Sequence, residues 1–158
     1  MFPEEFEKEG GINFHSEGID FELNDFMLKT NWLEKLIEQE NKTLLLLNFI
    51  FCSDEYLHKV NVEYLQHDTY TDIITFPLSD LPNIEGDIFI SIDRIRENAS
   101  KFEVSFEEEL NRVLSHGVLH LCGYGDKSEK EATLMRQKEN DALKLLKSIS
   151  LNQPKRQS

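Results

Sequence analysis

The sequence predicts an α+β fold in which a single small mixed β-sheet is surrounded by helices. The strongest indication is TLLLLNFIFC (43–52), which is apolar at nearly every position and is typical of a strand buried on both faces. Two further strand-like segments, TDIITFPL (71–78) and EGDIFISI (85–92), are separated by the turn-rich DLPN. Helical patterns lie between and after these strands, so both hairpin-like and crossover connections are expected.

The N-terminal third of the chain alternates between strand and helix patterns. INFHSEGIDFEL (12–23) alternates apolar and polar residues around a glycine, which predicts a strand or a broken strand pair near a sheet edge. Apolar residues then recur at helical intervals in 26–40, with Asn41 as a stop, and again in 53–65. The candidate N-terminal caps are Asn24 or Asp25 for the first helix and Ser53 or Asp54 for the second.

Three more helices are predicted in the C-terminal part of the chain, over 92–102, 105–123 and 128–149. The last two open with SFEE and SEKE, in which a serine is followed three residues later by a glutamate. This is the pattern of a capping box. We expect one domain over residues 1–150, followed by a flexible tail over 151–158.

Size and composition are those of an ordinary globular protein. The chain has 158 residues, 39% of them hydrophobic and 30% charged, which is enough for one proper core. Cys52 and Cys122 lack the repeated spacing of a disulfide scaffold, which favours a reducing, cytoplasmic location. The first ten residues lack the pattern of a signal peptide, and the longest apolar run (44–52) is too short to span a membrane.

The formal net charge of −13 disfavours a general nucleic-acid-binding surface, because phosphate binding needs basic side chains. A local basic patch remains compatible with this charge. Basic residues lie before and after the motif described next, at Arg94, Arg96, Lys101, Arg112, Lys127, Lys130, Arg136 and Lys138. They form either such a patch or solvated helix faces that neighbouring glutamates balance.

The most informative segment is HGVLHLCGY (116–124). His116 and His120 are four residues apart, so on a helix they differ by about 40° in direction and project from one face. Two imidazoles in this arrangement can hold one zinc ion. The alternative is that both are partly buried polar residues on a packed helix.

Asp126 is the candidate third ligand. Gly123 and Gly125 can end the helix and turn the chain back, so that a carboxylate at 126 arrives from a loop. Carboxylate oxygen is an accepted zinc donor, and three protein ligands leave one position open for water. Asp126 is alternatively a cap of the following helix, and the same donors also suit iron, nickel or manganese.

Gly117 distinguishes this segment from the motif H-E-x-x-H of zinc peptidases, in which a glutamate between the histidines is the general base. Glycine has no group that accepts a proton. Peptide hydrolysis by the familiar arrangement is therefore disfavoured even if zinc is bound.

The chain also carries a family resemblance. HGVLHLCGY resembles the motif H-G-x-L-H-L-x-G-Y of the YbeY family of metal-dependent endoribonucleases and ribosomal RNA maturation factors. TDIITFP (71–77) is similar to the family segment T-D-V-L-S-F-P, and GDIFIS (86–91) to its strand G-D-I-x-I-S. The resemblance implies a small sheet with surrounding helices and a zinc ion at the mouth of a cleft.

Two positions depart from the family pattern. The family usually has a third histidine ten residues after the first, and here that position is Asp126. It also commonly has an arginine, thought to contact RNA phosphate, after the tyrosine that precedes the T-D motif. Here Tyr64 is followed by Leu65, so another basic residue must take that role if it is kept.

Polar residues near the T-D motif are candidates for lining the cleft. Thr71, Asp72 and Thr75 can face it from a strand, although Asp72 fits hydrogen bonding within a turn equally well. Asp87, at the start of the next strand, fits the structural role better. Cys122 lies near the motif but is interpreted as a small buried residue.

The resemblance implies a single-strand-directed endoribonuclease that acts in ribosomal RNA (16S 3′ end) maturation and ribosome quality control. One zinc ion, or another divalent metal, would be held by His116, His120 and Asp126. The implied partners are single-stranded or ribosomal RNA and the small ribosomal subunit. Two alternatives stay open: a non-cleaving ribosome assembly factor with a structural metal, and a zinc peptidase or amidase.

Overall fold

The computed structural model describes residues 10–152 and confirms the α+β fold with one mixed sheet. Its elements, in chain order, are β1 (Gly11–Glu17), α1 (Phe26–Gln39), β2 (Thr43–Cys52), α2 (Asp54–Leu65), β3 (Ile73–Pro77), β4 (Asn83–Ser91), α3 (Ile92–Lys101), α4 (Phe106–Leu121) and α5 (Glu129–Leu151).

The sheet has the strand order β1-β2-β4-β3. β1, β2 and β4 are parallel, and β3 is antiparallel to β4. As the sequence predicts, β2 is a central strand, and its last six residues (47–52) are buried. β1 occupies one edge. It ends at Glu17, before Gly18 with φ of +70°, so the strand pattern predicted over 12–23 is confirmed only in its first half.

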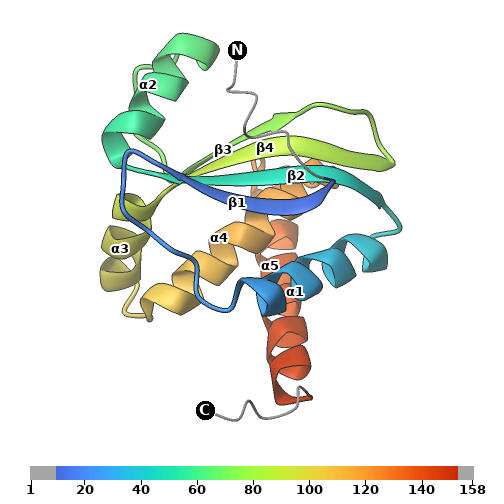
Figure 1. Cartoon of the computed structure of the whole chain (residues 1–158). Coiled ribbons are helices and arrows are strands. Elements are labelled where there is room, and N and C mark those ends of the chain that lie inside the picture. The colour runs from blue at the N-terminus through green and yellow to red at the C-terminus, as the bar shows by residue number, and fades with distance from the viewer. Residues whose placement is uncertain (1–9, 153–158) are drawn as a thin grey trace.

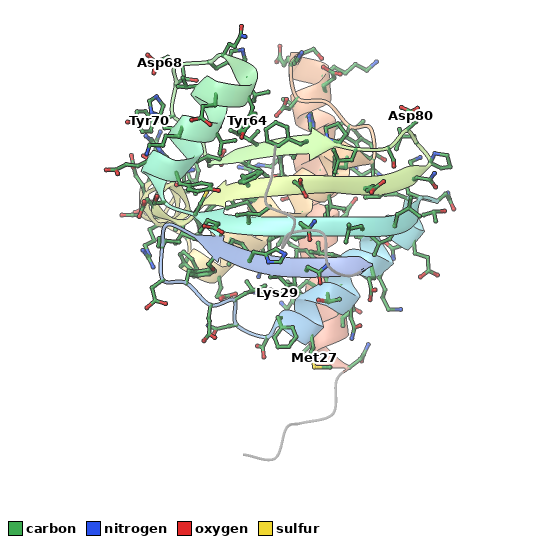
Figure 2. The ribbon with its side chains drawn as sticks, turned by 45° about the horizontal axis from the view of Figure 1, so that its top comes forward. Met27, Lys29, Tyr64, Asp68, Tyr70 and Asp80 are labelled. Carbon is green, nitrogen blue, oxygen red and sulfur yellow. The ribbon has the colours of Figure 1, made fainter. Side chains whose placement is uncertain are left out.

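Helices cover the two faces of the sheet unequally (Figure 1). α1, α4 and α5 lie on one face, where they enclose the larger core around Trp32, Phe49 and Ile88. α2 lies on the other face and packs Leu57 and Val60 against a smaller cluster. Figure 2 shows α2, with its labelled Tyr64, over the end of the sheet opposite to Asp80.

Three serine caps begin their helices as the sequence predicts. Ser53, Ser105 and Ser128 each accept a hydrogen bond from the backbone N–H three residues on, and at Ser128 both bonds of the capping box form. Asp25 precedes α1 in a left-handed conformation, and its side chain makes no capping bond to the helix. The prediction of a side-chain cap is therefore wrong there.

Within residues 10–152, the burial that the sequence predicts for Cys122 is confirmed. Cys52 and Cys122 are free and buried, and burial raises the pKa of each thiol to about 12, so both stay protonated near neutral pH. No helix in this part of the chain combines the length and the apolar character needed to cross a membrane. The tail predicted to be flexible lies outside the described residues, apart from its first two positions.

Candidate functional site

One face of α4 forms the floor of a cleft with a volume of about 430 Å³. Glu109, Val113, His116 and His120 recur at intervals of three or four residues and therefore share this face. The cleft is lined by Thr71, Asp72, Ile73, Thr75, Phe102, Glu109, Arg112, Val113, His116, His120, Asp126, Arg136 and Glu139. All the candidate cleft residues from the T-D motif and the histidine motif thus lie together.

The two histidines project in the same direction from α4. Their rings are almost parallel, with an interplanar angle of 7° and 6.4 Å between centroids. Nδ1 of His116 lies 2.7 Å from Oε2 of Glu139, and Nδ1 of His120 lies 3.0 Å from the carbonyl oxygen of Tyr124. A carboxylate and a carbonyl only accept hydrogen bonds, so each Nδ1 carries a proton, and the neutral form of each imidazole has its lone pair on Nε2.

The chain turns back after α4, as the glycines predict. α4 ends at Leu121, and Gly123 adopts a φ of +110°, which glycine reaches without steric cost. This turn returns Asp126 to the histidine face, where its Oδ2 lies 3.4 Å from Nε2 of His116. The cap of the next helix is Ser128, so the alternative role of Asp126 as that cap is excluded.

Glu139 on α5 is the central carboxylate of the cleft. Its Oε1 accepts hydrogen bonds from Arg112 at 3.1 Å and Arg136 at 3.4 Å, while its Oε2 accepts from His116. Burial alone would raise the pKa of Glu139, but the hydrogen bonds from His116 and Arg112 outweigh it and lower the pKa below its usual value. Glu139 is therefore ionised and fixes the orientation of the His116 ring.

The same pair changes the proton affinity of His116. Burial acts to lower the pKa of His116, but the hydrogen bond to Glu139 and the surrounding carboxylates outweigh it, so the pKa is raised. Burial also raises the pKa of Asp72 and that of Glu109 above their usual values. Asp72, Glu109 and Glu139 thus lie in a partly desolvated environment.

Asp87 lies outside the cleft. It is fully buried, and its Oδ1 accepts a hydrogen bond from the side-chain amide of Asn48 at 3.1 Å. The structural role that the sequence favoured for Asp87 is confirmed. Thr71, Asp72 and Thr75 by contrast all line the cleft.

Gly117 has a packing role that sequence reasoning did not anticipate. A Cβ at this position would lie 3.0 Å from Cδ1 of Ile73 and 3.1 Å from Cδ1 of Ile88. Gly117 therefore lets α4 approach the sheet closely, and a side chain there would point toward β3 and β4. A glutamate base as in zinc peptidases has no room at this position.

The side chains of His116, His120 and Asp126 offer donors that suit a divalent cation. Two Nε2 atoms with anchored Nδ1 partners are what metal-binding histidines generally present, and Asp126 adds a carboxylate. Within residues 10–152, no group of three or more His, Cys, Asp or Glu side chains is close enough together to be assigned as a metal site.

Sequence reasoning did not place seven of the lining residues in the cleft: Ile73, Phe102, Glu109, Arg112, Val113, Arg136 and Glu139. Arg112 and Arg136 were considered only as part of a basic patch or as residues of solvated helix faces. His116 and Glu139 are 23 positions apart and on different helices, so no local pattern connects them. Helical periodicity could have found Glu109 and Val113, since they lie seven and three positions before His116 on the same face of α4.

Comparisons with known proteins agree with the motifs. The family model described as Endoribonuclease YbeY matches residues 12–147. An Endoribonuclease YbeY of Christiangramia forsetii is 54% identical over 138 residues, covering 87% of this chain and 96% of the relative. One of Flavobacterium johnsoniae is 54% identical over 132 residues, covering 84% and 94%.

A solved structure shares the fold as well. The solution structure of a Thermotoga maritima protein superposes with a TM-score of 0.61 at 28% identity and covers 85% of this chain and 88% of its own. The identity to the curated relatives extends over nearly their whole length. The chain belongs to the YbeY family of endoribonucleases.

Proposed function

We propose that this protein is a metal-dependent endoribonuclease that cleaves single-stranded RNA in the cytoplasm. We propose further that it acts in the maturation of the 16S ribosomal RNA 3′ end and in ribosome quality control, with the small ribosomal subunit as partner. Family membership supports the endoribonuclease activity. The dependence on a metal, the choice of the 16S 3′ end as substrate and the small subunit as partner go beyond family membership and are part of the proposal.

The observation that carries the proposal is the shared anchoring of the two histidines. Each Nδ1 is held by a protein acceptor, so both Nε2 atoms are available on the same side of α4, and the carboxylate of Asp126 lies beside one of them. His116, His120 and Asp126 would hold a zinc ion, an arrangement with two nitrogen donors and one oxygen donor. When bound, the ion supplies a Lewis acid for a phosphate oxygen or for water.

The charge of the cleft supports a cation. Four of its lining residues carry carboxyl groups and two carry guanidinium groups: Asp72, Glu109, Asp126 and Glu139, and Arg112 and Arg136. An acidic cleft in a chain of net charge −13 repels phosphate. A bound divalent ion offsets this repulsion, so we expect RNA binding to depend on the metal.

Arg136 is the residue best placed to take over the phosphate contact that the family assigns to the position of Leu65. Leu65 ends α2 and is not among the residues that line the cleft. Arg136 lines the cleft, and its side chain is 60% exposed, so it can reach an RNA phosphate. Arg112 is more buried and is paired with Glu139, which suits it to orienting that carboxylate.

The test combines metal analysis with cleavage of a single-stranded RNA. The purified chain is expected to contain about one divalent ion, and His120→Ala is expected to lose both the ion and cleavage. His67→Ala is the matched control, because His67 is exposed and does not line the cleft. Cleavage that persists in metal-free protein would contradict the proposal.

The alternative of a non-cleaving assembly factor gives a different result. It predicts association with ribosomal subunits that is unchanged in His116→Ala, together with no RNA cleavage by the wild-type chain. The two measurements therefore separate the two functions.

A further inference from the structure

We propose that Phe102 is a base-stacking platform, which binds a nucleobase next to the cleaved phosphate and thereby selects single-stranded RNA. The inference rests on the proposed function, since it names a recognition element of the same cleft. Phe102 caps the C-terminus of α3 and is the phenylalanine among the residues that line the cleft.

The exposure of Phe102 is unexpected from its position in the helix pattern. Ile92, Ile95 and Ala99 form the buried stripe of α3, and a residue three positions further along would continue this stripe into the core. Phe102 is instead 52% exposed. Its ring therefore contributes little to the core and presents an apolar surface to a cleft that is otherwise largely polar.

The surroundings of the ring match the three contacts that single-stranded RNA requires. Aromatic rings stack on unpaired bases, polar side chains bind the base edges, and cations bind the phosphates. Thr71, Asp72 and Thr75 offer donors and acceptors in the same cleft, and Arg136 offers a cation. Lys101, whose Nζ lies over one face of the Phe102 ring at 5.8 Å from its centroid, adds a second cation at the platform.

The position of the ring suits a nucleotide that flanks the reaction centre. The turn after Phe102 leads directly into α4, the helix that carries both histidines. Along α4, Glu109 and His116 are separated by two helical turns, about 10 Å. Phe102 and the two histidines line the same cleft, so a base stacked on Phe102 would belong to a nucleotide near the scissile phosphate. Bases within a duplex are stacked on one another and cannot make this contact.

The experiment measures the affinity of the full chain for a short unstructured oligoribonucleotide and for the same oligomer with abasic sites. Phe102→Ala is expected to weaken binding of the normal oligomer by about 5- to 150-fold, the range for loss of one stacked base. It is expected to leave binding of the abasic oligomer unchanged. Phe102→Trp should restore affinity, whereas Phe102→Leu, which is apolar without a π-face, should not.

Phe26→Ala is the matched control, because Phe26 is 59% exposed and does not line the cleft. The inference is overturned if Phe102→Ala binds the normal oligomer as tightly as the wild-type chain, or if it weakens binding of both oligomers equally. A wild-type chain that neither binds nor cleaves RNA would overturn the proposed function as well. Cleavage by the wild-type chain with no effect at Phe102 would overturn the stacking role alone.

Discussion

Two hydrogen-bonded networks begin at adjacent residues of α5 and have different functions. In the cleft network, Glu139 accepts hydrogen bonds from His116, Arg112 and Arg136. In the loop network, Glu40 accepts a hydrogen bond from the hydroxyl of Tyr124 at 2.6 Å and one from Lys138 at 3.1 Å. Each is built around one carboxylate. Glu139 lies on α5 and binds side chains of α4, whereas Glu40 lies at the end of α1 and binds Lys138 of α5 and Tyr124 of the loop after α4.

The difference between the networks lies in what each carboxylate holds. Glu139 contacts a candidate ligand directly, and it is also the only acceptor that the structure assigns to Arg112 among the described residues. Glu40 holds Tyr124, whose backbone carbonyl in turn accepts from Nδ1 of His120. The cleft network therefore orients the imidazole of His116, whereas the loop network stabilises the turn between His120 and Asp126.

The largest effect is expected from Glu139→Ala. The substitution removes the acceptor of His116 Nδ1 and leaves two arginines without this partner, so metal affinity and cleavage should fall by about 10- to 100-fold. Glu139→Gln keeps an acceptor for the imidazole and should recover part of the loss. Chelator competition and initial cleavage rates measure both effects. Unchanged zinc affinity in Glu139→Ala would show that the cleft network does not position the ligand.

A smaller and different effect is expected from Tyr124→Phe. The substitution removes the hydroxyl that donates to Glu40 but leaves the backbone carbonyl that accepts from His120. The free energy of unfolding should fall by about 0.5–1.5 kcal/mol, while metal affinity changes less than in Glu139→Ala. Urea denaturation and the same chelator competition provide the comparison. If Tyr124→Phe lowered metal affinity as much as Glu139→Ala does, the loop network would also position a ligand, which would contradict the different roles assigned to the two networks.

The smallest effect is expected from Lys138→Met. Lys138 is partly exposed, and the worth of such an ion pair with Glu40 is about 0.2–1 kcal/mol. Because salt screens exposed charges, the difference from the wild-type chain should shrink as ionic strength rises. Thermal unfolding at low and high salt measures it, with Lys130→Met on the exposed face of α5 as the control. An effect that is independent of salt would mean that Lys138 acts by packing over the Tyr124 ring.

Local patterns in the sequence were sufficient to predict most of the strands and helices. They also predicted the part of the site that lies in the T-D motif and the histidine motif. The apolar run of β2 and the serine caps follow from burial and from backbone hydrogen bonding within a few residues, and the structure confirms them. The shared face of His116 and His120 follows from helical periodicity alone. The left-handed Asp25 and the early end of β1 were not predicted, because both depend on how the connecting segment packs.

By itself, the sequence determined the α+β class, because each strand and helix shows its own local pattern. It also determined the histidine pair on one helix and the turn that returns Asp126, because these depend on residues that are close together in the chain. Only the tertiary structure decided that Glu139 anchors His116, that Gly117 is a contact between α4 and the sheet, and that Phe102 lines the cleft. These contacts join elements far apart in the chain. Their partners are chosen by the packing of helices on the sheet, which local periodicity does not encode.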